Sequence, residues 1–187
     1  VQAAIAHPEV KILNCSLNTS HRYIRTYYAR MYEAKFLMGA IAGAMAENGQ
    51  LAYIADYPIF GTIANINAFA LGAKMVNPRA QIYLEWSTLK DVDLGIAMDN
   101  VIKKGVTVVS GRDMVIPEDA SRYFGLYHIE KEGPRNLAMP LWHWGKFYEQ
   151  LIRTIMDGTW KYDDNKDETK AINYWLSLIH ISEPTRH

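Results

Sequence analysis

Cysteine is nearly absent from this 187-residue chain, which has a single one, Cys15, so no internal disulfide can form. Long apolar runs are also absent: the most apolar stretch, residues 36–46, is shorter than the roughly 18 residues that a membrane-spanning helix requires. Neither sign of charge is in excess, because 20 Lys and Arg residues balance 20 Asp and Glu residues. The charge balance therefore favours neither nucleic acid nor an anionic membrane surface as a partner.

Sequence signatures of common enzymes are missing too. The chain has no GxSxG nucleophile elbow, no phosphate-binding P-loop and no HExxH zinc motif. Gly39 and Gly43 lie inside a helical pattern rather than at a turn from a strand into a helix, so they are not a dinucleotide-binding fingerprint. The six histidines show no metal-ligand spacing. We therefore expect a non-catalytic protein without a cofactor or a bound metal.

The two ends of the chain differ in character from the rest. The chain begins at Val1 in a helical pattern, without the charged and apolar regions of a signal peptide. Its end, residues 176–187, reads LSLIHISEPTRH and resembles the in-frame translation of a transposase-type sequencing-library adapter. We expect this segment to be a non-native tail and the chain to be a fragment, so the tail is left out of the predicted fold.

Between these ends, short apolar runs alternate with longer stretches of helical periodicity. The apolar runs predict strands at residues 10–16, 50–56, 80–87, 106–111 and 124–130. The periodic stretches, several of them ended by Asn-Gly, Asn-Pro or Asp-Gly, predict helices at residues 32–49, 61–78, 91–105 and 144–156. Strands that alternate with helices favour right-handed crossovers and a parallel sheet. The predicted fold is therefore three-layer α/β.

Two of the predicted helices carry further local signals. Gly39 and Gly43 lie one turn apart, which predicts that their helix packs closely on the sheet. The helix at 91–105 has Asp91 and Asp93 near its start and two lysines in its last turn, as the helix dipole favours. Both signals support helices at these positions.

Polar and aromatic residues follow the predicted strands at one end. In an open parallel α/β sheet, ligands bind outside the carboxyl ends of the strands. At those ends the sequence places aromatic rings, carboxylates, an arginine and an amide, which are Asn14, Asp56, Tyr57, Trp86, Arg112 and Asp113. Aromatic rings stack on the faces of a flat ligand, while carboxylates and amides bind its hydroxyl groups and ring nitrogens. The sequence thus predicts a small, flat and polar ligand.

Each of these residues also has a purely structural interpretation. Trp86 at the end of a strand can be a lid over the core, and Asp56 before Tyr-Pro can simply start a turn. Arg112 and Asp113 can pair with each other. His128, inside an apolar strand, is interpreted as a structural residue rather than a ligand-binding one. These alternatives stay open at the level of the sequence.

Several spaced motifs resemble one family. The segment YEAKFLMG at residues 32–39 is followed by Ala42-Gly43, Pro58, NAFALGA at 67–73 and VNP at 76–78. In this order they resemble the basic membrane protein family, the purine-nucleoside-receptor-like substrate-binding proteins of bacterial ABC transporters. Residues 136–160, NLAMPLWHWGKFYEQLIRTIMDGTW, are similar to a later segment of one branch of that family. The resemblance covers residues 1 to about 175.

The resemblance implies a type I periplasmic-binding-protein-like fold, with parallel sheets and flanking helices in two lobes that close on a ligand between them. It implies that residues 1–30 are the end of lobe one and that residues 31–140 form lobe two. Residues 141–175 would then be the hinge return and its helix. Residues 176–187 stay outside this division, as the expected tail.

The resemblance also implies a function. It indicates the substrate-binding protein of a bacterial ABC transporter, which binds a small polar solute, a nucleoside in typical members, and docks on the permease of the transporter. Such a protein lies in the cell envelope, outside the cytoplasm. It would be held at the plasma membrane by a lipid anchor that lies outside these residues.

The chain departs from the family pattern at two places. Residues 125–128 (GLYH) replace the Gly-x-Asp-x-Asp segment of many members, and Trp142 or His143 stands where members carry a lysine near the last helix. Trp142 is therefore expected to stack on the ligand, with a buried hinge tryptophan as the alternative. Trp144, one turn from Tyr148, is expected to pack in the core.

Two other functions compete with this one. The same fold occurs in cytoplasmic ligand-sensing regulators, so a regulator domain located in the cytoplasm is the alternative. An α/β enzyme such as a nucleoside hydrolase would need paired carboxylates close to a water molecule. Asp56 and Asp113 are the loop candidates for such a pair.

Overall fold

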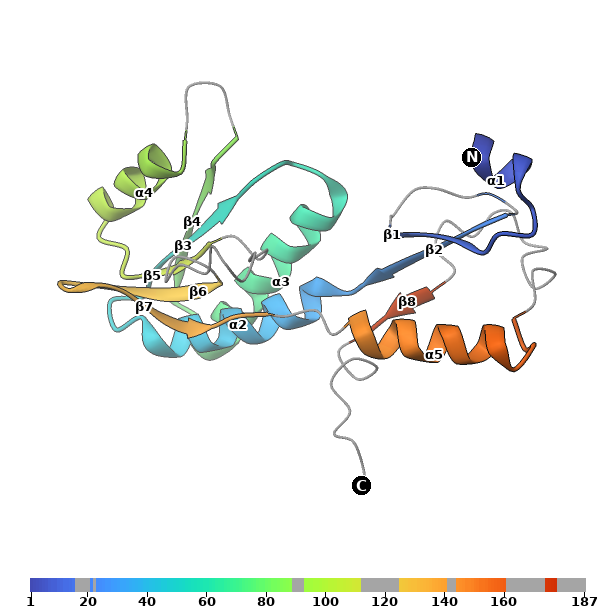
Figure 1. Cartoon of the computed structure of the whole chain (residues 1–187). Coiled ribbons are helices and arrows are strands. Elements are labelled where there is room, and N and C mark those ends of the chain that lie inside the picture. Colours follow the sequence, from blue (N-terminus) through green and yellow to red (C-terminus); the bar gives the residue numbers. More distant parts are fainter. Residues whose placement is uncertain are drawn as a thin grey trace. The chain divides into compact units, whose positions relative to one another are not determined.

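Figure 1 shows the chain as a computed structural model, which describes residues 1–15, 21, 23–88, 93–111, 125–140, 144–160 and 174–177. The chain forms two compact units. Unit 1 consists of Val1–Arg30 and Trp142–His187, and unit 2 consists of Met31–Leu141. Among the described residues, no helix has both the length and the apolar character needed to cross a bilayer.

The sheet of unit 1 has three parallel strands in the order β1-β2-β8, which are β1 (Ile12–Cys15), β2 (Ile24–Ala29) and β8 (Tyr174–Leu176). Helices α1 (Gln2–Ala6) and α5 (Trp144–Met156) belong to the same unit. Neither β2 nor β8 is among the strands predicted from the sequence. Leu176, the first residue of the expected tail, pairs with Ala29 and accepts a 2.8 Å hydrogen bond from the Arg30 N–H. The sheet thus includes a residue that the prediction left out of the fold.

Unit 2 contains a five-stranded sheet in the order β4-β3-β5-β6-β7. Its strands are β3 (Gln50–Ala55), β4 (Gln81–Trp86), β5 (Val108–Ser110), β6 (Leu126–Glu130) and β7 (Gly133–Ala138). β4, β3 and β5 are parallel, as predicted, whereas β6 is antiparallel to both β5 and β7. The expectation that residues 124–130 add a parallel strand is therefore wrong in direction. β6 and β7 are joined by the short turn Lys131-Glu132, and such a connection allows only antiparallel neighbours.

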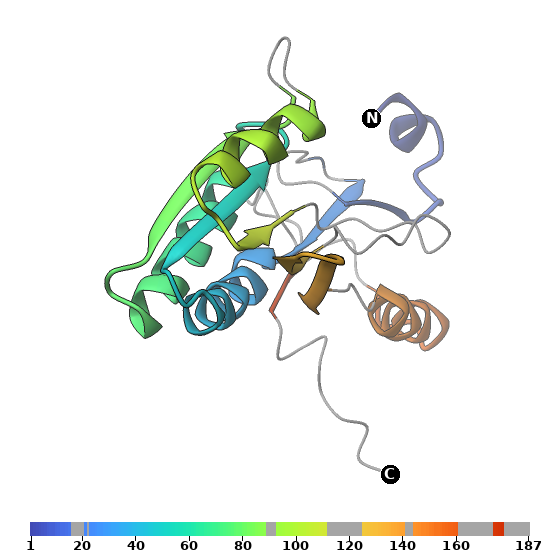
Figure 2. The ribbon, with the colours of Figure 1, turned by 90° about the vertical axis from the view of Figure 1, so that its left-hand side faces the viewer.

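β3 is buried on both of its faces, so unit 2 has three layers. Three helices provide the outer layers: α2 (Met31–Met45), α3 (Phe60–Val76) and α4 (Leu94–Lys103). One set of alternate β3 residues packs in a cluster with α2 and α3, namely Leu51, Tyr53 and Ala55. The other set, Ala52 and Ile54, packs with α4. Figure 2 shows α2 and α4 on opposite sides of the sheet, which confirms the three-layer α/β prediction.

Helix α4 begins and ends as its sequence predicts. The Asp93 carboxylate accepts a 2.9 Å hydrogen bond from the Ile96 N–H, which caps the first turn. Lys103 lies in the last turn and Lys104 follows directly, both beside the negative end of the helix dipole.

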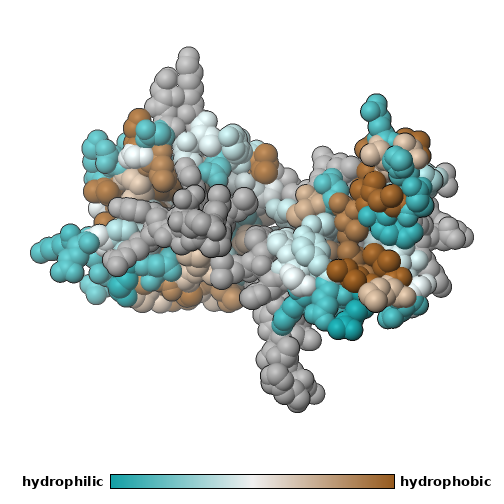
Figure 3. Space-filling view, in the orientation of Figure 1, coloured by the Kyte–Doolittle hydropathy of each residue, from teal (hydrophilic) through white to brown (hydrophobic). Residues whose placement is uncertain are grey.

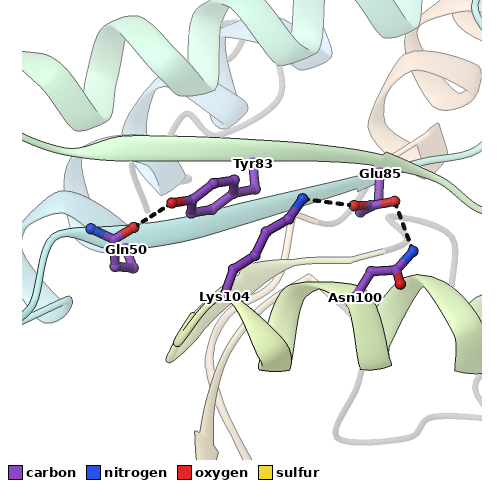
Figure 4. Close-up of polar contacts among 5 residues, drawn as sticks. All are labelled: Gln50, Tyr83, Glu85, Asn100 and Lys104. Atoms are coloured by element: carbon purple, nitrogen blue, oxygen red, sulfur yellow. Dashed lines mark hydrogen bonds and ion pairs between the residues drawn. The ribbon is translucent and has the colours of Figure 1, made fainter.

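A group of polar side chains, drawn in Figure 4, fastens α4 to β4. Glu85 of β4 forms an ion pair with Lys104 at 3.2 Å and accepts a 3.4 Å hydrogen bond from the Asn100 amide. The Lys104 ammonium also lies 4.9 Å from the centre of the Tyr83 ring, and the Tyr83 hydroxyl donates to Gln50 at 2.8 Å. The members of this group bind one another, so we interpret it as a structural cluster rather than a ligand site.

α2 and α3 approach one another through glycines. A Cβ atom on Gly39 would lie 2.0 Å from the Phe69 carbonyl oxygen, and one on Gly72 would lie 2.0 Å from the Phe36 carbonyl oxygen. Gly43 also faces the backbone of α3. The prediction of close packing is confirmed, but the partner of these glycines is α3 and not the sheet.

α2 is apolar on its exposed side as well as on its buried side. Met38 and Ala42 are buried, whereas Leu37, Ile41 and Met45, spaced one turn apart, are exposed. Figure 3 shows brown, apolar side chains along the lower border of unit 2, where Figure 1 places α2. The helical spacing of apolar residues therefore locates this helix but does not identify its buried side.

Replacing Gly39 by alanine is expected to destabilise the protein, because the new methyl group would overlap the Phe69 carbonyl and force the two helices apart. Overpacking of this kind costs about 1–3 kcal/mol, which equilibrium unfolding in urea would measure. The matched control is Gly145→Ala in α5, where a Cβ atom meets nothing within 4 Å. That change is expected to be neutral or to stabilise by up to about 1 kcal/mol. An unchanged unfolding free energy in Gly39→Ala would contradict the helix contact described.

Candidate functional site

The carboxyl ends of β3, β4 and β5 lie at one edge of the sheet of unit 2. Ala55 and Trp86, the last residues of β3 and β4, are paired, and Ser110, the last residue of β5, pairs with Tyr53 of β3. The residues at and directly after these strand ends therefore come together in what is termed here the carboxyl edge. Its described members are Asp56, Tyr57, Trp86, Ser87, Thr88, Ser110 and Gly111. The sequence predicts a ligand site at this place.

Asp56 is an exposed carboxylate of the carboxyl edge, and Ser87 orients it. The Ser87 hydroxyl lies 2.9 Å from Asp56 Oδ1 and 3.3 Å from the Ala55 carbonyl oxygen. The Ser87 N–H also donates to the Ala55 carbonyl, at 2.9 Å, and the Thr88 hydroxyl donates to the backbone carbonyl of Asp56. The loops after β3 and β4 are thus joined. One carboxylate oxygen is held by Ser87, while the other has no hydrogen bond to any residue that the structure describes.

The two aromatic rings of the carboxyl edge are placed differently. Tyr57 is 63% exposed, so its ring is open to a ligand. Trp86 is partly buried and packs against the hydrophobic cluster of α2 and α3. Trp86 therefore forms a lid over the core, which is the structural alternative that the sequence leaves open. Its contact with a ligand stays a prediction.

A buried lysine at the same edge is not predicted by the sequence analysis. Lys35 of α2 is 0% exposed, and its ammonium donates a 3.2 Å hydrogen bond to Ser110 Oγ. The same ammonium lies 5.0 Å from the centre of the Tyr53 ring. The signal that could have found Lys35 is its position, because it falls at helical spacing between the buried residues Met31 and Met38. A charge within a buried helical stripe indicates a specific polar contact inside the protein.

The strand-end residues of unit 1 are Asn14 and Cys15. Asn14 lies in β1, is partly buried and pairs with Thr26 of β2. Although Cys15 is exposed as a residue, partial burial of its thiol raises the thiol pKa, and a hydrogen bond with Tyr27 offsets part of this rise. A raised pKa leaves less thiolate near neutral pH, so Cys15 is a poor nucleophile.

Helix α5 begins with three closely spaced aromatic residues, Trp144, Phe147 and Tyr148. Trp144, Phe147 and Tyr148 pack around Tyr27 of β2, with their ring centres 5.3, 4.9 and 6.0 Å from that of Tyr27. The hydroxyl groups of Tyr27 and Tyr148 lie 2.7 Å apart. Burial, reinforced by this contact, raises the pKa of Tyr27 far above its usual value, so the phenol stays neutral. Trp144 therefore packs against Tyr27, but it is partly buried and not in the core as expected.

Three of the predicted ligand residues, Arg112, Asp113 and Trp142, lie outside the described residues, as does His143. Their roles stay predictions. His128, interpreted from the sequence as structural, lies in β6 with its Nδ1 atom 3.5 Å from Glu130 of the same strand. In the part of the chain that the structure describes, no three His, Cys, Asp or Glu side chains are grouped so as to hold a metal ion.

Comparison with known proteins identifies the family. Residues 11–117, more than half of the chain, match the family described as ABC transporter substrate-binding protein PnrA-like. The chain belongs to this family. The PnrA-like family consists of solute-binding proteins of transporters and is not a class of enzymes. The matched residues contain β3, β4 and β5, and with them the described carboxyl edge.

Two relatives of this PnrA-like chain are named for the solutes that they bind. A Haloferax volcanii protein described as an ABC transporter glucose-binding protein is 29% identical over 147 residues, covering 73% of this chain and 38% of that protein. A purine-binding protein of Brucella abortus is 27% identical over 174 residues, covering 86% of this chain and 49% of that protein. The chain therefore spans about half the length of these relatives or less.

A solved structure shares the fold. The solute-binding protein of an ABC transporter system from Conexibacter woesei matches with a TM-score of 0.56 at 13% sequence identity. The match covers 95% of this chain and 60% of that protein. At this identity the similarity concerns the fold alone. It confirms the expected α/β fold of the periplasmic-binding-protein type.

Proposed function

We propose that the protein is the substrate-binding protein of an ABC transporter and that it binds a nucleoside, or a polar solute of similar chemistry, at the carboxyl edge. The observation that carries the proposal is the arrangement of Asp56. One oxygen of its carboxylate is held by Ser87, and the exposed ring of Tyr57 follows it in the chain. Membership of the PnrA-like family supports the role in transport.

The chemistry of these groups suits a nucleoside. A carboxylate with an open oxygen accepts hydrogen bonds from sugar hydroxyl groups, and an exposed aromatic ring stacks on a flat base. Arg112 and Asp113 follow Gly111 at the end of β5, so we propose that they add a guanidinium group and a second carboxylate to the same site. The remaining proposed ligand residues are Trp86, Asn14 and Trp142.

The names of the relatives support the same solute class. The Haloferax relative is described as binding glucose and the Brucella relative as binding purines. A purine nucleoside contains both kinds of group, a polyhydroxylated sugar and a heteroaromatic base. Hydrogen-bond acceptors for the sugar and a stacking surface for the base are therefore the two features that the site must provide.

The partner in this proposal is the permease of the transporter. A binding protein of this kind signals to its permease because the solute stabilises one conformation, which the permease then recognises. The family supports a location outside the cytoplasm. Attachment to the plasma membrane through a lipid anchor, outside the residues of this chain, belongs to the same proposal.

The function is tested by isothermal titration of the full-length protein with adenosine, guanosine, adenine and glucose in parallel. We expect one of the nucleosides to bind more tightly than adenine or glucose, because only a nucleoside uses both the carboxylate and the aromatic ring. Binding of none of these solutes would exclude the proposed solute class. Release of free base and ribose during the titration would indicate a hydrolase instead.

Removing the charge of either proposed carboxylate should weaken the binding of adenosine. Asp113→Asn and Asp56→Asn are each expected to cost about 1–3 kcal/mol, the scale of one charge-assisted hydrogen bond. Asp93→Asn is the matched control, because Asp93 caps α4 and asparagine caps a helix equally well. Unchanged affinity in Asp113→Asn would remove Asp113 from the site, and the same result for Asp56→Asn would remove Asp56.

A bound heteroaromatic base should quench tryptophan fluorescence if it stacks on Trp142. The quench is expected to shrink more in Trp142→Phe than in Trp144→Phe, because Trp144 packs against Tyr27. Trp142→Ala should lose about tenfold in affinity, since stacking contributes about 0.5–1.5 kcal/mol beyond the contact area lost. Equal quenching in the two phenylalanine variants would mean that this segment contributes through packing alone.

A further inference from the structure

Lys35 places a charge in the interior of unit 2. Its side chain is 0% exposed, on the face of α2 that also buries Met31 and Met38. Moving an ammonium group out of water is costly unless polar contacts compensate for the lost hydration. A methionine at this position would fill similar space without that cost. Packing alone therefore does not explain a lysine here.

The ammonium group contacts side chains of two neighbouring strands, β5 and β3. It donates to the hydroxyl of Ser110, the last residue of β5, at 3.2 Å. It also faces the ring of Tyr53, which is the residue of β3 paired with Ser110. Because the hydroxyl oxygen accepts from Lys35, the Ser110 proton must be directed elsewhere. Lys35 thus fixes both the position and the donor direction of Ser110.

The residue after Ser110 is held as well. The Gly111 N–H donates a 2.7 Å hydrogen bond to the carbonyl of Gly125, which immediately precedes β6. Gly125 has a φ of +64°, and a Cβ atom there would lie 2.4 Å from the Ala138 carbonyl oxygen. The end of β5 is therefore fixed by the Lys35 side chain and by a backbone contact to the start of β6.

We propose that Lys35 is a positioning residue of the ligand site. By holding the end of β5, it keeps Ser110 and Gly111 in place at the carboxyl edge. The inference rests on the proposed function, because Lys35 is buried and would act on the ligand through the end of β5. A side chain of similar length without a donor would fill the space but would not hold the Ser110 hydroxyl.

The experiment compares two variants that remove the same hydrogen bond from opposite sides, Lys35→Met and Ser110→Ala. Lys35→Arg keeps a charged donor. Lys104→Met is the matched control, because Lys104 belongs to the cluster that fastens α4 to β4. Each full-length variant is titrated with adenosine, and hydrogen exchange with solvent is measured at the amides of Gly111 and, as an internal reference, Leu51.

Lys35→Met and Ser110→Ala are each expected to lower the affinity for adenosine about tenfold and to speed exchange at Gly111 by a similar factor, with Leu51 unchanged. The double variant should lose no more than Lys35→Met alone, because that change already removes the hydrogen bond to Ser110. Lys35→Arg should show smaller changes than Lys35→Met in both the adenosine affinity and the exchange rate at Gly111. Lys104→Met should change neither the adenosine affinity nor the exchange rate at Gly111.

Unaltered adenosine affinity in folded Lys35→Met and Ser110→Ala would overturn the proposal. If the unmodified protein does not bind adenosine, the proposed function fails for this solute. The exchange rate at Gly111 then decides by itself whether Lys35 holds the end of β5. Faster exchange in both variants then supports the positioning role, and unchanged exchange rejects it. If Lys35→Met does not fold, Ser110→Ala provides the same two measurements with a smaller change of volume.

Discussion

Burial of β3 on both faces is the constraint on which the rest of unit 2 depends. A strand with two buried faces needs a cover on each, so helices lie on both sides of the sheet. The crossovers that carry those helices keep β4, β3 and β5 parallel, and parallel strands end together. The location of the candidate site is therefore a consequence of apolar packing, before any polar residue is considered.

The polar residues at the carboxyl edge form two layers with different physical roles. Asp56 and Tyr57 are exposed, so they are suited to contact with a solute. Lys35 and Ser110 are buried and hydrogen-bonded to each other, so they belong to the supporting layer beneath the exposed one. The hydroxyl of Ser87, the residue after β4, holds one oxygen of the Asp56 carboxylate. In the proposed site, side chains held in place before the solute binds would favour affinity.

The sequence predicts those elements of the fold whose burial shows in the order of their own apolar and polar residues. β3 is recognised because a strand buried on both faces is a continuous apolar run, and α4 is recognised because burial with a period of 3.6 residues shows in its apolar pattern. β7 is missed because its sequence, GPRNLA, has no such pattern and forms a strand only through its hairpin with β6. The rule that ligands bind at the carboxyl ends of strands predicts that Asp56, Tyr57 and Trp86 lie at one edge, but it does not predict that Trp86 packs against the core. Lys35 is missed because its partner Ser110 is 75 residues away in the chain.

Among the described strands of unit 2, β4 is one of the two edge strands, with the sequence QIYLEW and with Leu84 40% exposed. An unpaired edge of such composition is a template on which strands of other molecules can assemble. Glu85 interrupts this edge with a charge, and its ion pair with Lys104 keeps the charge in place. A charge in an edge strand opposes such assembly, so the side chains that attach α4 to the sheet bear on aggregation as well as on packing.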